Sequence, residues 1–129
     1  MGRRRRVIEV QGLAHANPIP TAVRIDNLVF SGGIFGVDPA TGQAPATLAA
    51  QSERLFANLR LVIEAAGGSL DDIAKLTIWL KDPSDRAGLN DAWLATFPDP
   101  DDRPVRHTSR ADLKEPMLVQ AEFTAVLDR

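Results

Sequence analysis

The sequence predicts an α+β domain in which two helices cover one face of a sheet. Two stretches, 47–66 and 82–98, have helical periodicity, and the stretch 73–82 between them alternates apolar and polar residues as a half-buried strand does. Other extended stretches precede the first helix and follow the second, so the expected order is β-β-β-α-β-α-β-β. Because two helices cover only one face of such a sheet, the other face needs a lid or a neighbouring subunit.

The N-terminal third of the chain is expected to be extended. Residues 7–10, VIEV, form a short β-prone stretch. Residues 21–36 form two extended pieces that meet at Asp26-Asn27, a pair that favours turns. Residues 37–45 are rich in Pro, Gly and Asp and therefore form a loop before the first helix.

The helix at 47–66 has the clearest signals. Thr47 can act as its N-cap, and Gly67-Gly68 can supply a left-handed stop. The apolar side chains fall at spacings of three and four and form one stripe, which is expected to pack on the sheet: Leu55, Phe56, Leu59, Val62, Ile63 and Ala66. Four polar side chains lie off this stripe: Gln51, Asn58, Arg60 and Glu64.

The second helix and two strands complete the predicted fold. The helix at 82–98 is expected to begin with Ser84 as its N-cap, and Gly88 weakens it by about 1 kcal/mol relative to Ala. A polar loop follows, and strands are expected at about 105–111 and 117–127. The last strand has one unbroken apolar face, which we expect under the helices.

Two charged residues stand out in these last strands. Arg106 shares a face with Thr108 and Arg110, and Glu122 lies on the mixed face of its strand. If the two strands pair, both charges can open toward one cleft on the helix-free side. A surface Arg–Glu pair that contributes at most about 1 kcal/mol would explain the same pattern.

Composition excludes several classes of function. The 129 residues suffice for one domain, 1–129, and the net charge is −2; without the four arginines of Arg3–Arg6, 11 positive charges remain against 17 negative ones. This acidic body argues against a nucleic-acid partner. The basic run in residues 1–6 is then either a solvated tail or an arm for nucleic acid or membranes.

Metal, membrane and export signals are also weak. The chain has no Cys, and of its two His residues His15 is expected to be exposed in a loop, so no metal site is predicted. No apolar run approaches the ~18 residues of a membrane span, and we see no secretory signal. The expected location is the cytoplasm.

The chain resembles one known family along nearly its whole length. The matching stretches are LVFSGGIFGVDPATG (28–42), LFANLRLVIEAAGGSLDDIAKLTIWLKD (55–82), LND (89–91), PVRHT (104–108) and QAEFTAV (120–126). Together they resemble the Rid (YjgF/YER057c/UK114) family, which includes enamine/imine deaminases. The resemblance implies a chorismate-mutase-like fold, a mixed sheet with two helices on one face, and a homotrimer with active sites in the clefts between subunits.

The same resemblance implies hydrolysis of 2-imino or enamine acids to 2-keto acids and ammonia, without a cofactor. Arg106, in Pro104-Val105-Arg106, matches the arginine that pairs with the substrate carboxylate, and Glu122 matches the glutamate that holds the attacking water. Asn90 and Thr108 match residues that line the site. A guanidinium offers a planar fork to a carboxylate, and a carboxylate within reach of water can act as a general base.

Several positions depart from the family pattern. Ile19 stands where the family commonly has an aromatic pocket residue, and the chain has no Tyr. The family's SGQ is Ser31-Gly32-Gly33 here, a turn whose backbone N–H groups are expected to help bind the substrate carboxylate. His107 stands where a small residue is usual, and a regular strand would place it on the face opposite Arg106.

Two other functions stay open at this point. The Arg106 site can bind a keto acid or another carboxylate without turnover, which would be seen as ligand binding without ammonia release. RNA cleavage or translational inhibition is an older label for members of the family, and the acidic body argues against it.

Overall fold

The structure, a computed structural model, describes residues 3–128. Met1, Gly2 and Arg129 lie outside the described residues, so the predicted domain 1–129 and basic tail 1–6 are described only in part. The described chain forms β1 (Arg6–Ile8), β2 (Ala22–Ile25), β3 (Leu28–Ser31), β4 (Ile34–Phe35), α1 (Leu48–Ala65), the short 3-10 helix η1 (Leu70–Asp72), β5 (Ile73–Leu80), α2 (Ala87–Thr96), β6 (Val105–Arg110) and β7 (Val119–Val126).

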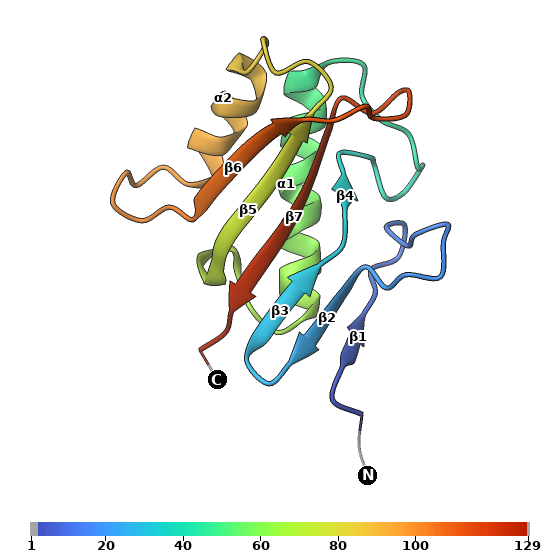
Figure 1. Cartoon of the computed structure of the whole chain (residues 1–129), viewed down its shortest axis with the longest axis vertical. Coiled ribbons are helices and arrows are strands. Elements are labelled where there is room, and N and C mark those ends of the chain that lie inside the picture. The colour runs from blue at the N-terminus through green and yellow to red at the C-terminus, as the bar shows by residue number, and fades with distance from the viewer. Residues whose placement is uncertain (1–2, 129) are drawn as a thin grey trace.

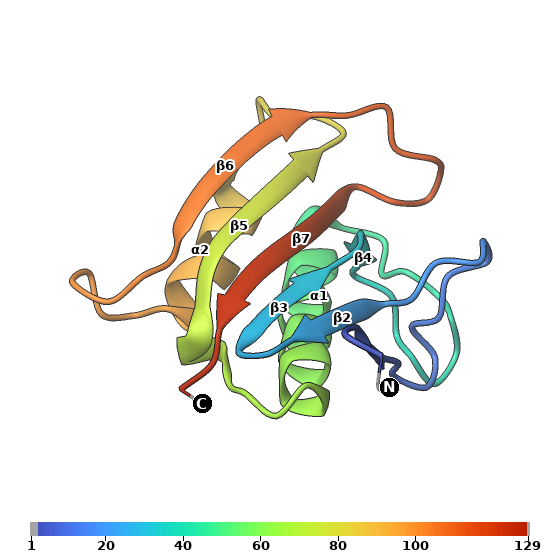
Figure 2. The same cartoon turned by 60° about the horizontal axis from the view of Figure 1, so that its bottom comes forward.

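The strands form one mixed sheet in the order β1-β2-β3-β7-β5-β6, with the short β4 beside β7. The β5–β6 pair is parallel and is joined through α2, whereas the other pairs are antiparallel. Both long helices lie behind the sheet in Figure 1, and the view in Figure 2 keeps them on the same side. The predicted α+β fold with two helices on one face is confirmed.

Both ends of α1 have the predicted local chemistry. Thr47 Oγ1 accepts a hydrogen bond from the Ala50 N–H at 3.1 Å. At the other end Gly67 has φ +95°, which favours glycine, and its N–H donates to Glu64 O while the Gly68 N–H donates to Ile63 O. The helix therefore stops before the turn that leads into η1 and β5. Within residues 3–128 no helix has both the length and the apolar character to cross a membrane.

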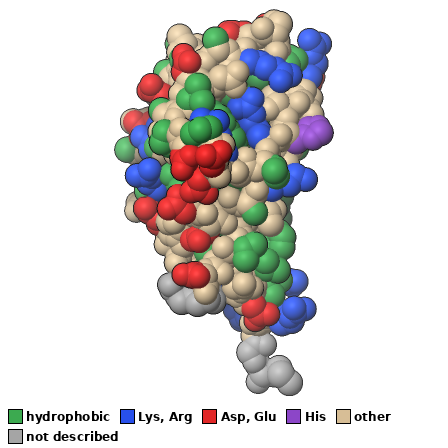
Figure 3. Space-filling model, turned by 90° about the vertical axis from the view of Figure 1, so that its left-hand side faces the viewer, with side chains coloured by type: hydrophobic (Ala, Val, Ile, Leu, Met, Phe, Trp, Pro, Cys, Tyr) green, Lys and Arg blue, Asp and Glu red, His purple; other side chains and the backbone are tan. Residues whose placement is uncertain are grey.

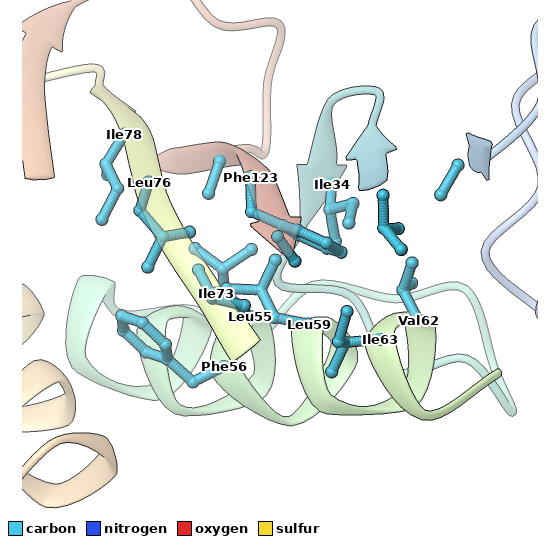
Figure 4. Packing of buried hydrophobic residues seen from close by; sticks show 14 of the residues in the cluster. Ile34, Leu55, Phe56, Leu59, Val62, Ile63, Ile73, Leu76, Ile78 and Phe123 are labelled. Carbon is cyan, nitrogen blue, oxygen red and sulfur yellow. The ribbon is translucent and has the colours of Figure 1, made fainter. Parts of the chain in front are cut away.

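The core lies between α1, α2 and the inner face of the sheet. Leu55, Leu59 and Ile63 of α1 are fully buried, and Figure 4 shows them facing Leu76 of β5 and Phe123 of β7. Every second residue of β7 is also buried against the helices, as its alternation predicts: Val119, Ala121, Phe123 and Ala125. This one-sided burial leaves the other face of the sheet open within the described chain.

Three local predictions were wrong. The second helix begins at Ala87, because Ser84 Oγ donates to Asp82 Oδ1 at 2.6 Å and stabilises a turn before the helix. Arg6 belongs to β1 and its guanidinium reaches Ala65 O, so it is not part of a free tail. The stretch 21–36 contains three strands, since Gly32 and Gly33 interrupt the extended structure between β3 and β4.

A candidate active site in two halves

The strands that carry Arg106 and Glu122 are not neighbours. β5 lies between them, and its Leu76 is in register with Arg106 while its Thr77 is in register with Glu122. Consecutive residues of a strand point to opposite faces, so Arg106 lies on the helix-bearing face and Glu122 on the helix-free face. The expectation of one cleft on the helix-free side is therefore wrong for a single chain. The parallel crossover through α2 places β6 at the sheet edge, where it cannot pair with β7.

Arg106 is held in place by α2. Its Nη2 donates to Asn90 Oδ1 at 2.9 Å, and its guanidinium lies 5.0 Å from the centroid of the Trp93 ring. Burial lowers the pKa of Arg106, and the charge of Arg86 lowers it further. Within residues 3–128 no carboxylate lies within ion-pair distance of Arg106. A partly buried guanidinium without a carboxylate partner is suited to bind an anion from outside the chain.

Asn90 and Thr108 lie with Arg106 on the helix-bearing face, and these three residues form the first half of the candidate site. Thr108 is two residues beyond Arg106 on the same face of β6, in register with Ile78. Trp93 is the residue that the sequence analysis did not identify as part of the site. Its position three residues after Asn90 was the available signal, since residues at that spacing share one side of a helix.

The second half of the site lies on the helix-free face. Glu122 of β7, Thr77 of β5 and His107 of β6 are in register and form a row across three strands. His107 thus lies on the face opposite Arg106, as predicted, and it is exposed. Neighbouring strands are about 4.8 Å apart, so His107 and Glu122 are separated by roughly 10 Å at their backbones.

The glycine turn lies beside Glu122, but one of its N–H groups is already used. Gly32 N donates to Thr21 O at 2.9 Å, so this N–H group is not free for the predicted contact of the turn with the substrate carboxylate. Ser31 Oγ accepts from Phe123 N and donates to Gly32 O, each at 2.8 Å, and so joins the turn to β7. Of the two glycines only Gly33 remains a candidate donor.

The loop between β1 and β2 brings two further side chains near this face. A Cβ on Gly32 would lie 3.2 Å from His15 Nε2, so the His15 ring packs on the glycine turn. His15 is partly buried, which corrects the expectation that it is exposed. Ile19, the predicted pocket residue, is 50% exposed.

Two hollows in the described part of the chain, residues 3–128, leave Arg106 and Glu122 apart. One hollow of about 650 Å³ lies between the outer sides of α1 and α2 and is lined by neither Arg106 nor Glu122. A smaller one, about 220 Å³, borders His15 and Gly33 but not Arg106. No cluster of three or more metal-ligating His, Cys, Asp or Glu side chains occurs in the described part of the chain.

Comparison with known proteins assigns the family. The family model described as Endoribonuclease L-PSP matches residues 10–127. The chain belongs to this family. It is the YjgF/RutC/Rid family that the sequence motifs resemble, so the predicted family membership is confirmed.

Relatives in the Rid family have different names. A RutC family protein of Pyrococcus abyssi is 33% identical over 81 residues, which are 62% of this chain and 64% of that protein. The 2-iminobutanoate/2-iminopropanoate deaminase of Escherichia coli is 36% identical over 84 residues, 65% of this chain and 66% of that protein. Each match spans just under two thirds of the relative's length.

The fold agrees with a solved Rid structure over nearly the full chain. RidA from an Antarctic Psychrobacter species is 32% identical, with a TM-score of 0.88, and the superposition covers 95% of this chain and 100% of that one. The mixed sheet with two helices is thus shared with RidA.

Proposed function

We propose that this Rid protein hydrolyses 2-imino or enamine acids to 2-keto acids and ammonia, with Arg106 binding the substrate carboxylate. The proposal rests on the environment of Arg106. This side chain is partly buried, contacts Asn90 and Trp93, and has no carboxylate partner in residues 3–128. The deaminase name of the E. coli relative supports the reaction class.

In the proposed reaction Glu122 acts on water. Its carboxylate takes a proton from a water molecule as the oxygen bonds to C2 of the imino acid, and the imine nitrogen takes up a proton. Glu122 then returns the proton to the amino group of the resulting carbinolamine, the C–N bond breaks and ammonia leaves. The hydroxyl oxygen loses its proton to solvent as the C=O bond of the 2-keto acid forms. An enamine substrate first gains a proton at C3 and becomes the imine. Arg106 fixes the carboxylate, so that C2 is oriented toward the water.

A site that uses both residues requires two copies of the chain. Arg106 and Glu122 lie on opposite faces of one sheet, so Glu122 of a second copy has to meet Arg106 of the first. Exposed apolar side chains also lie on the helix-free face, where a second copy can cover them: Val7, Leu28, Phe30, Val105 and Val126. We therefore propose the homotrimer that the family resemblance implies, with three sites between subunits.

Carboxylate binding without turnover is the second candidate function. It is favoured by the hydrogen bond from Gly32 N to Thr21 O, which removes one expected donor, and by the exposure of Ile19. RNA cleavage, the activity in the family description, is less favoured because the chain carries a net charge of −2. The cytoplasmic location stays a prediction.

The test is keto-acid and ammonia formation from imino acids that an amino-acid oxidase generates in situ. We expect Arg106→Ala to lower the rate by at least about 30-fold, since truncating a buried charge partner costs about 2–5 kcal/mol. Arg106→Lys should restore only part of it, because lysine lacks the planar fork. Arg60→Ala, an exposed arginine on α1, is the matched control.

Two results would change the proposal. Unaltered turnover in folded Arg106→Ala protein would exclude Arg106 as the anchor. Keto-acid binding that depends on Arg106, without acceleration of any imino acid, would favour the binding protein. Circular dichroism of each variant distinguishes loss of the anchor from loss of the fold.

A further inference from the structure

We propose that the Arg106 site prefers imino and keto acids that carry a second carboxylate, and that Arg86 binds this second group. The inference rests on the proposed function, because it assumes that Arg106 binds the first carboxylate. It adds a substrate class, the acids whose side chain is itself acidic.

Asn90 has a hydrogen bond to each of the two arginines, through its backbone to Arg86 and through its side chain to Arg106. The Asn90 N–H donates to Arg86 O at 2.8 Å, so Arg86 lies one helical turn before Asn90. Residues four apart are neighbours on a helix surface, about 5–6 Å between Cβ atoms. Asn90 Oδ1 in turn accepts from Arg106 Nη2. Arg86 and Arg106 therefore reach the same side of α2, one from the helix and one from β6.

The charges of the two arginines are close enough to interact. Burial lowers the pKa of Arg106, and the positive charge of Arg86 lowers it further, so Arg86 lies near enough to disfavour the charge of Arg106. Arg86 Nε donates to Pro83 O at 3.0 Å, which restrains the side chain. Within residues 3–128 neither guanidinium lies within ion-pair distance of a carboxylate. Two adjacent cations without acidic partners favour a ligand with two negative charges.

A third arginine on this edge has a different environment. Arg110 shares the β6 face of Arg106. Hydrogen bonds from Ser84 are the main cause of the lowered pKa of Asp82, and the charge of Arg110 adds to it, so an acidic side chain lies near Arg110. Figure 3, which looks onto the side of α2 and β6, shows a group of Lys and Arg side chains at its upper right, with Asp and Glu side chains mostly to their left. Arg110→Ala is thus a matched control for Arg86→Ala, because both substitutions change the net charge by the same amount.

The experiment compares binding of 2-oxoglutarate, a dicarboxylate, with that of 2-oxobutanoate, a monocarboxylate, by isothermal titration calorimetry. Wild type is expected to prefer 2-oxoglutarate. Arg86→Ala should lower the ratio of the two affinities about fivefold, the effect of one exposed charge pair. Arg86→Lys should keep most of the preference, and Arg110→Ala should leave the ratio unchanged. The preference should shrink as salt is raised, because exposed charges are screened.

The outcomes separate this inference from the proposed function. If both ligands bind and Arg106→Ala abolishes binding, but Arg86→Ala leaves the ratio unchanged, only the role of Arg86 is overturned. An equal change in Arg110→Ala also overturns it, because a general loss of positive charge then explains the effect. If neither ligand binds wild type in an Arg106-dependent way, the proposed function fails, and this inference fails with it.

Discussion

The side chain of Asn58 holds the segment after β4 against α1. Asn58 is fully buried, and its Nδ2 donates to the backbone oxygens of Phe35 and Val37, each at 2.8 Å. Its Oδ1 accepts from Arg54 Nε at 3.3 Å. A buried carbonyl that loses its partner costs about 1–3 kcal/mol, so this one amide stabilises two loop carbonyls at once.

Asn58→Ala is therefore expected to lower the free energy of unfolding by about 2–4 kcal/mol, since both carbonyls lose their donor. Urea unfolding followed by circular dichroism measures the change. Glu64→Ala, exposed on the same helix, should change stability by less than about 0.5 kcal/mol. Equal effects of the two substitutions would show that water replaces the amide at no cost.

Periodicity alone could not predict this burial. Gln51 and Asn58 lie off the apolar stripe of α1, yet both are buried. Gln51 bonds Pro45 O and Pro116 O, and it accepts from Leu118 N, 67 residues away in the chain. Their burial depends on which loop carbonyls come to lie against the helix, and a local pattern does not contain that information.

Helices and strands could be predicted from the sequence where the residues that determine them lie close together in the chain. The cap at Thr47, the stop at Gly67-Gly68 and the alternation of β7 each depend on residues within one turn or one strand. Strand pairing depends on the whole chain instead. The sequence identified Arg106 and Glu122 by type and motif, but their placement on opposite faces follows from β5 lying between β6 and β7.

Gly88 of α2 shows a packing requirement that overrides helix propensity. A Cβ at this position would lie 2.9 Å from Ala49 N and 3.0 Å from Ala49 Cα, at the start of α1. Helix propensity alone predicts that Gly88→Ala stabilises the protein by about 1 kcal/mol. The contact is with backbone atoms, which cannot rotate away, so α2 has to shift.

We therefore expect Gly88→Ala to lower the free energy of unfolding by about 1–3 kcal/mol and to weaken keto-acid binding, because the shift carries Asn90 away from Arg106. Denaturant unfolding and calorimetry measure the two effects. Ala95→Gly, at an exposed position of the same helix, reports the propensity effect alone. A more stable Gly88→Ala protein would show that the two helices separate easily.

At the scale of the whole molecule, one chain leaves both the sheet and the site incomplete. The helix-free face has the exposed apolar side chains Phe30 and Val105, and it also carries Glu122. Arg106 lies at the opposite face, on the edge strand β6. A contact between the helix-free face of one copy and the β6 edge of the next would bury the apolar residues and unite Arg106 with Glu122. Assembly and catalysis would then depend on the same contact.

Two inactive variants are accordingly expected to restore activity to each other. Arg106→Ala subunits keep Glu122, and Glu122→Gln subunits keep Arg106. In a cyclic trimer that contains both kinds of subunit, one of the interfaces joins the two intact halves, so activity should be about a third of wild type. Co-expression with two affinity tags isolates mixed trimers, light scattering confirms their mass, and keto-acid formation measures recovery. Mixed trimers as inactive as either parent would show that Arg106 and Glu122 do not meet across a subunit interface.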